Sequence, residues 1–121
     1  MNIAIIGLGR VGAQFIQKSA YFKEKGIQIV AAAEPHDTEG KKAAIETGIP
    51  VKRSDEIALM GDSLDIIFDL TGSAEVRRSL RTGLHQSDNH HTTIAPETIA
   101  YMLWSIMEDK TLPDVHKHKG Y

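Results

Sequence analysis

The first twelve residues pass from an apolar run into a glycine-rich turn and then into a helical pattern. The apolar run is Ile3–Ile6, and the turn reads Gly7-Leu8-Gly9-Arg10-Val11-Gly12, which has the spacing G-x-G-x-x-G. In this spacing the first glycine permits a tight turn, the second lets a pyrophosphate approach the backbone, and the third lets helix and strand pack closely. Unpaired N–H groups at the helix start would then bind the pyrophosphate. The pattern therefore predicts the first strand–turn–helix unit of a dinucleotide-binding domain.

A second apolar run ends in an acid at the distance that such a domain uses. Residues 27–33 are followed by Glu34, about 20 residues beyond the glycines, where a carboxylate accepts hydrogen bonds from an adenosine ribose. Because a carboxylate repels a 2′-phosphate, the cofactor expected is NAD, with NADP disfavoured. Arg10 could reach the pyrophosphate or a 2′-phosphate, and Lys41 and Lys42 could favour NADP by binding a 2′-phosphate. The alternative for each of these three cations is an ordinary solvated side chain.

Length, charge and cysteine content exclude several classes of protein. At 121 residues the chain is expected to form one domain over residues 1–110, with a C-terminal tail over 111–121. The net charge of −2 provides no large positive field, so nucleic acid is not an expected partner. The chain has no cysteine and no recognised set of metal-ligand spacings, so no metal site is expected. Without an apolar stretch of membrane-spanning length or room for a leader, we expect a cytoplasmic protein.

Apolar runs alternate with helical patterns along the rest of the chain. Five short strands separated by helices predict a doubly wound, parallel α/β sheet in spatial order 3-2-1-4-5. The predicted strands lie near residues 3–6, 27–33, 49–51, 64–70 and 92–95, and the predicted helices near 10–22, 39–47, 54–60, 74–84 and from 96 onward. Ligands bind such sheets beyond the carboxyl ends of the strands, where the strand order reverses. The cofactor-binding residues predicted there are Gly7, Leu8, Gly9, Arg10, Val11, Gly12, Glu34, Thr71, Gly72 and Ser73.

Three segments resemble the N-terminal NAD(P)-binding Rossmann domain of several oxidoreductases. They are residues 5–12, 30–35 and 64–72, and the families are glucose-fructose oxidoreductase/inositol dehydrogenase, dihydrodipicolinate reductase and homoserine dehydrogenase. The resemblance implies that Thr71 and Gly72 lie beside the ribose or nicotinamide end of the cofactor. In the first of these families a Glu-Lys-Pro sequence supplies a catalytic lysine, whereas this chain has Ala95-Pro96-Glu97 at the corresponding place.

Because the catalytic lysine is missing, the sequence leaves three functional hypotheses open. The leading one is a stand-alone, NAD-preferring cofactor-binding or sensor module without its own substrate domain. The second is a small NAD(P)-dependent oxidoreductase completed by another subunit, with His91 or Glu97 as the acid–base group near Thr71. The third is a regulatory domain similar to those of potassium transport systems, whose Gly-x-Gly-Arg turn is alike but whose Gly-Asp-Ala-Thr segment is absent here.

The last helical segment is apolar around most of its circumference. Its expected core-facing stripe comprises Ile99, Met102, Leu103, Ile106 and Met107, with Tyr101 and Trp104 on the opposite side. Aromatic residues are common interface anchors, so the sequence favours a homodimer formed through the helix that contains Trp104. The alternative is that the C-terminal tail folds back over Trp104. On the preceding helix, Arg77, Arg78 and Arg81 are expected to form a solvated face rather than an anion-binding strip.

Overall fold

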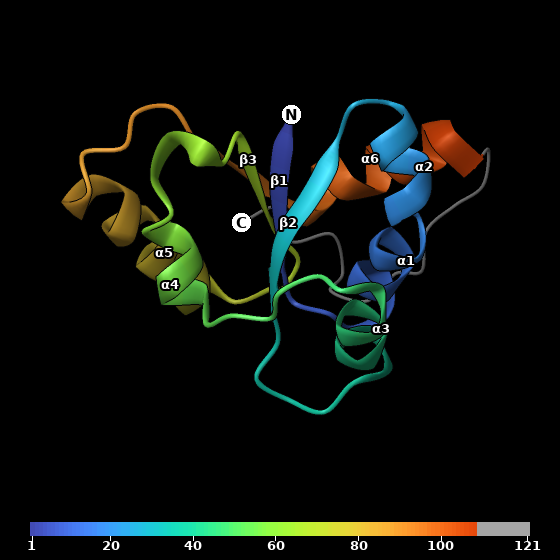
Figure 1. Cartoon of the computed structure of the whole chain (residues 1–121). Coiled ribbons are helices and arrows are strands. Elements are labelled where there is room, and N and C mark those ends of the chain that lie inside the picture. Colours follow the sequence, from blue (N-terminus) through green and yellow to red (C-terminus); the bar gives the residue numbers. More distant parts are fainter. Residues whose placement is uncertain (109–121) are drawn as a thin grey trace.

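The computed structural model describes residues 1–108 and contains a four-stranded parallel sheet. The strands are β1 (Asn2–Ile6), β2 (Gln28–Ala33), β3 (Ile66–Asp69) and β4 (Thr93–Pro96), in the spatial order β2-β1-β3-β4 (Figure 1). β1 is central, and its carboxyl end pairs with the carboxyl ends of both neighbours, so the turns that follow these strands lie at one edge of the sheet. This arrangement confirms the predicted α/β class and parallel topology.

The predicted strand at residues 49–51 is reduced to one bridge beside β2. Val51 pairs with Ala32, whose N–H donates to the Pro50 carbonyl at 2.9 Å and whose carbonyl accepts from the Lys52 N–H at 2.8 Å. Pro50 has no N–H with which to extend a ladder. The segment nevertheless lies next to β2, as the predicted order 3-2-1-4-5 requires.

Helices cover both faces of the sheet (Figure 1). One face carries α1 (Arg10–Gln17), α2 (Ser19–Glu24), α3 (Glu39–Thr47) and α6 (Glu97–Glu108); the other carries α4 (Ser54–Ala58), the short 3₁₀ turn η1 (Gly61–Ser63) and α5 (Ala74–Gln86). Alternate residues of each strand enter the two cores: Ile3 and Ile5 face the first, and Ala4 and Ile6 the second. Burial on both faces explains why the strands are nearly continuous apolar runs.

The helix predicted over residues 10–22 is broken into two. Lys18 leaves helical geometry at φ −95° and ψ 10°, and its N–H donates to the Phe15 carbonyl, three residues back rather than four. The break lets Phe15 on α1 and Phe22 on α2 both enter the core, where their ring centroids lie 5.7 Å apart. The helix predicted over residues 39–47 has the expected bounds, with a Thr38 N-cap and a left-handed Gly48 C-cap.

The predicted orientation of the last helix is wrong. Trp104 is only 4% exposed and packs against Phe15 with ring centroids 6.0 Å apart, so it belongs to this chain's own core. The residues expected to face the core divide: Leu103 and Met107 pack against it, whereas Ile99, Met102 and Ile106 are exposed. The exposed apolar face of α6 is therefore the one that carries Ile99, Met102 and Ile106.

Arg77 also departs from the sequence prediction. Its side chain is buried, and its guanidinium Nε donates to Asp69 Oδ2 at 3.0 Å, where a solvated face was expected.

The predicted tail over residues 111–121 lies outside the described residues. Within residues 1–108, none of the helices has the length and apolarity needed to cross a membrane.

Candidate functional site

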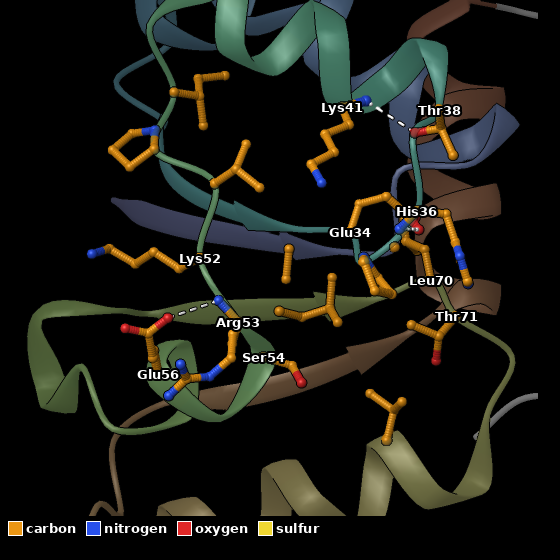
Figure 2. Close-up of a pocket in the computed structure, with 18 of the residues that line it drawn as sticks. Glu34, His36, Thr38, Lys41, Lys52, Arg53, Ser54, Glu56, Leu70 and Thr71 are labelled. Carbon is orange, nitrogen blue, oxygen red and sulfur yellow. Dashed lines mark hydrogen bonds between the residues drawn. The ribbon is translucent and has the colours of Figure 1, made fainter.

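A cleft of about 1350 Å³ opens at the carboxyl ends of β1, β2 and β3. Its walls are α3, the segment of residues 48–56 and the turn after β3 (Figure 2). Among the predicted site residues, it brings together Gly7, Gly9, Glu34 and Thr71. Its volume is ample for a nucleotide-sized ligand, since ligand sites are commonly about 300–1,000 Å³.

The structure requires glycine at two of the three glycine positions of the turn, and for different reasons. Gly7 has φ 96°, a left-handed conformation, and its N–H donates to the Ala33 carbonyl at 2.8 Å. A Cβ on Gly12 would lie 2.2 Å from the Gly7 carbonyl oxygen, so only glycine permits this contact between α1 and the end of β1. Gly9 has an extended backbone, and a Cβ on it would meet no described atom within 4 Å. The fold therefore explains Gly7 and Gly12 but places no steric requirement on Gly9.

The start of α1 is open to an anion. Within residues 1–108, no side chain caps this helix, and its first turn contains no acidic residue. By contrast, Thr38 caps α3 and Ser73 caps α5, and each of those helices has an acid in its first turn. Because the N–H groups at a helix start attract negative charge, the start of α1 offers hydrogen-bond donors for an anion beside Gly9.

Glu34 links the end of β2 to the glycine turn. Its Oε1 accepts the N–H of Leu8 at 2.8 Å, and its Oε2 accepts the N–H of His36 at 3.0 Å. Each carboxylate oxygen can accept a further hydrogen bond. Glu34 thus braces the turn and still has acceptor capacity toward the cleft.

The turn after β3 is held by a buried ion pair. Asp69 is fully buried, and its Oδ1 accepts both the N–H of Thr71 (3.1 Å) and the Thr71 hydroxyl (2.7 Å), while Oδ2 accepts from Arg77. The Thr71 hydroxyl in turn accepts the Ser73 N–H at 3.1 Å, and Ser73 caps α5 through the Val76 N–H. Gly72 has φ 67°. These bonds fix the turn, so that Thr71 lines the cleft while Gly72 and Ser73 support it.

The remaining residues of the glycine turn divide by burial. Leu8 and Val11 are buried beneath the turn and contribute packing, whereas Arg10 is exposed and does not line the cleft. Lys41 does line it: the side chain is 27% exposed and extends from α3 into the cleft (Figure 2), with Nζ 4.0 Å from Asp37. Lys42 is outside the lining.

The two acid–base candidates lie in different places. His91 precedes β4, and its Nε2 lies 2.7 Å from Oδ1 of Asp65, which precedes β3. Both residues are at the amino ends of parallel strands, so the structure does not bring His91 near Thr71. Glu97 follows β4 at the carboxyl edge, is 1% exposed and accepts the Tyr101 hydroxyl at 3.4 Å.

Two contributors to the site were missed as site residues in the sequence. The Thr38 hydroxyl donates to the Leu8 carbonyl at 2.8 Å, and a Cβ on Gly40 would lie 2.4 Å from the same oxygen. Thr38 was recognisable only as a helix N-cap, and the glycine at position 40 was the one local signal of a close approach. Among residues 1–108, no group of three or more histidine, aspartate or glutamate side chains could hold a metal ion.

Comparison with solved structures connects this geometry to known folds. The homoserine dehydrogenase of S. aureus is similar at 20% identity and a TM-score of 0.54, over 90% of this chain and 30% of that chain. The homoserine dehydrogenase of Thiobacillus denitrificans (19% identity, TM-score 0.47) and an NAD-binding protein from Listeria innocua (10%, TM-score 0.46) also match over 90% of this chain, covering 26% and 40% of theirs.

The chain thus spans about 30% of the length of the first of these proteins. No protein-family model and no curated protein sequence matches it. The structural likeness, together with the sheet order and the glycine turn, establishes a Rossmann-like α/β fold resembling the N-terminal domain of homoserine dehydrogenase.

Proposed function

We propose that this chain binds a nicotinamide dinucleotide, with the pyrophosphate on the Gly7–Gly12 turn. The observation that carries the proposal is Gly9, which lines the cleft although neither its φ nor its surroundings require glycine. A ligand that approaches the backbone closely gives a reason for the absent side chain. The uncapped start of α1 beside it supplies donors for the phosphate oxygens.

The adenosine ribose would then lie at Glu34, which favours NAD over NADP. Its carboxylate retains acceptor capacity for the ribose hydroxyls and would repel a 2′-phosphate. Lys41 lines the same cleft, as do Lys52 and Arg53, and opposes this preference because its ammonium would attract the same phosphate. Because Glu34 stands at the end of β2, where the ribose is proposed to lie, we expect its charge to set the preference and NADH to bind more tightly than NADPH.

A cofactor-binding or sensor role is consistent with the sequence at the end of β4, which lacks the catalytic lysine of the resembling enzymes. The chain has Ala95-Pro96-Glu97 there, without the lysine that the resemblance to glucose-fructose oxidoreductase implied. The alternative is an NAD(P)-dependent oxidoreductase whose substrate site is completed by another subunit or partner. In that case Glu97, at the sheet edge that carries the cleft, is the candidate acid–base group, and hydride transfer to a carbonyl substrate would distinguish the two functions.

We also propose that two copies associate through α6. The helix has no charged residue between Glu97 and Glu108, and its exposed side presents Ile99, Met102 and Ile106 at the spacing of one helical stripe. An apolar stripe with this exposure is typical of an interaction surface.

The cofactor proposal is tested by calorimetric titration of the purified protein with NADH, NADPH, NAD and NADP. The matched variant is Glu34→Gln, which keeps an acceptor oxygen for the Leu8 N–H but removes the charge and the acceptor for the His36 N–H. We expect wild type to prefer the two NAD forms and the variant to lose that preference, because the repulsion of the 2′-phosphate is removed. Absence of binding by all four nucleotides at millimolar concentration would refute the proposal.

A further inference from the structure

The backbone of Leu8 is held on both sides by residues that follow β2. The Leu8 carbonyl oxygen accepts a hydrogen bond from the Thr38 hydroxyl at 2.8 Å. On the other side of the same residue, the Leu8 N–H donates to Glu34 Oε1 at 2.8 Å. The Leu8 side chain is fully buried, so the residue is fixed by its backbone and by its packing.

The Thr38 hydroxyl is directed toward this carbonyl. Its oxygen accepts the N–H of Lys41 at 3.0 Å, which caps α3, and the single hydroxyl proton is donated to Leu8. Gly40, the second residue of α3, lets the helix backbone lie directly against the Leu8 oxygen, since a Cβ there would be 2.4 Å from it. The start of α3 therefore contacts the Leu8 carbonyl through both the Thr38 hydroxyl and the backbone at Gly40.

The geometry of the peptide bond links this contact to the orientation of the Gly9 N–H at the proposed cofactor site. The Leu8 carbonyl and the Gly9 N–H belong to one planar trans peptide and point in opposite directions. Anchoring the carbonyl toward α3 thus fixes the direction of the Gly9 N–H. Resting on the proposed dinucleotide function, we propose that Thr38 is a positioning residue, whose hydroxyl holds the Leu8–Gly9 peptide in the orientation that receives the pyrophosphate.

The test compares NADH affinity and Leu8 amide exchange in three variants. Thr38→Val removes the hydroxyl with little change of shape, and Thr38→Ser retains it. Thr47→Val is the matched control, because the Thr47 hydroxyl donates to the Ala43 carbonyl at 2.7 Å within the same helix, and Thr47 does not line the cleft. All titrations are made at a temperature where thermal melts show every variant folded.

We expect Thr38→Val to weaken NADH binding about tenfold, while Thr38→Ser and Thr47→Val stay within about twofold of wild type. In the free protein, NMR should show faster amide exchange at Leu8 in Thr38→Val and not in the other two variants. Loss of the α3 cap alone would destabilise the helix but leave NADH affinity and Leu8 exchange unchanged, and that result would overturn the inference. Faster Leu8 exchange with unchanged NADH affinity would also overturn the positioning role.

The two proposals fail separately in this experiment. If wild type binds no NADH, the proposed function is refuted, and the Leu8 exchange rates still decide whether Thr38 holds the turn. If wild type binds NADH and all three variants bind it equally, the proposed function stands and the role of Thr38 is refuted.

Discussion

Replacing Gly12 with alanine should destabilise the fold by an amount that follows from one contact. The added Cβ would lie 2.2 Å from the Gly7 carbonyl oxygen, whereas ordinary contact begins at 3.4 Å, so the two atoms must separate by about 1.2 Å. The obstacle is backbone rather than a flexible side chain, so α1 must shift and disturb the packing of Val11 and Phe15. Such overpacking costs about 3 kcal/mol, and the better helix propensity of alanine returns about 1 kcal/mol. The net loss is about 2 kcal/mol, which corresponds to a melting temperature about 8 °C lower for a domain of this size.

Gly9→Ala is the matched control for this prediction. Its Cβ meets no described atom within 4 Å and its backbone is extended, so the free energy of unfolding should change by less than about 0.5 kcal/mol. Both variants are measured by thermal and urea unfolding followed by circular dichroism. A Gly12→Ala protein as stable as wild type, or a Gly9→Ala protein less stable than Gly12→Ala, would refute the steric reasoning.

Three further perturbations address other contacts. Asp69→Asn removes the carboxylate that Arg77 faces in the interior and should cost about 3 kcal/mol in urea unfolding; a loss below about 1 kcal/mol would contradict the buried ion pair. The pKa of Asp65 is lowered from 3.8, chiefly by the Asn2 N–H, so its stabilisation is complete above pH 3.8 and is lost as pH falls through the lower folded-state pKa. The melting temperatures of wild type and Asp65→Asn should therefore converge in acid, and a difference that grows toward low pH would contradict the assigned sign. Ile106→Lys places a charge on the exposed face of α6 and should convert a dimer to a monomer in analytical ultracentrifugation; a dimer that persists would exclude this face.

The features predicted well from sequence are those set by local chemistry. The glycine spacing specifies a tight turn because left-handed backbone at Gly7 and close packing at Gly12 both exclude other side chains. The bounds of α3 follow from the Thr38 cap and the Gly48 end, which are local signals. The sheet order follows from right-handed crossovers between successive strands.

The features predicted wrongly depend on contacts between distant segments. α6 is apolar around most of its circumference, so its hydrophobic periodicity does not specify which side meets the sheet; the space beside Phe15 selects Trp104. Arg77 was expected in solvent because its partner, Asp69, lies on a different element. The bond between Thr38 and Leu8 joins residues 30 positions apart, so the local signals at Thr38 and Gly40 do not identify Leu8 as the partner.

Cofactor affinity of Gly9→Ala relative to wild type tests the central claim most directly. The substitution leaves the fold unstrained, so a loss of NADH affinity reports the approach of the ligand to the backbone rather than damage to the protein. We expect calorimetry to show NADH binding by wild type and a dissociation constant raised about tenfold or more in the variant. Equal NADH affinity in the two proteins, or no binding by wild type, would contradict a pyrophosphate site on the glycine turn.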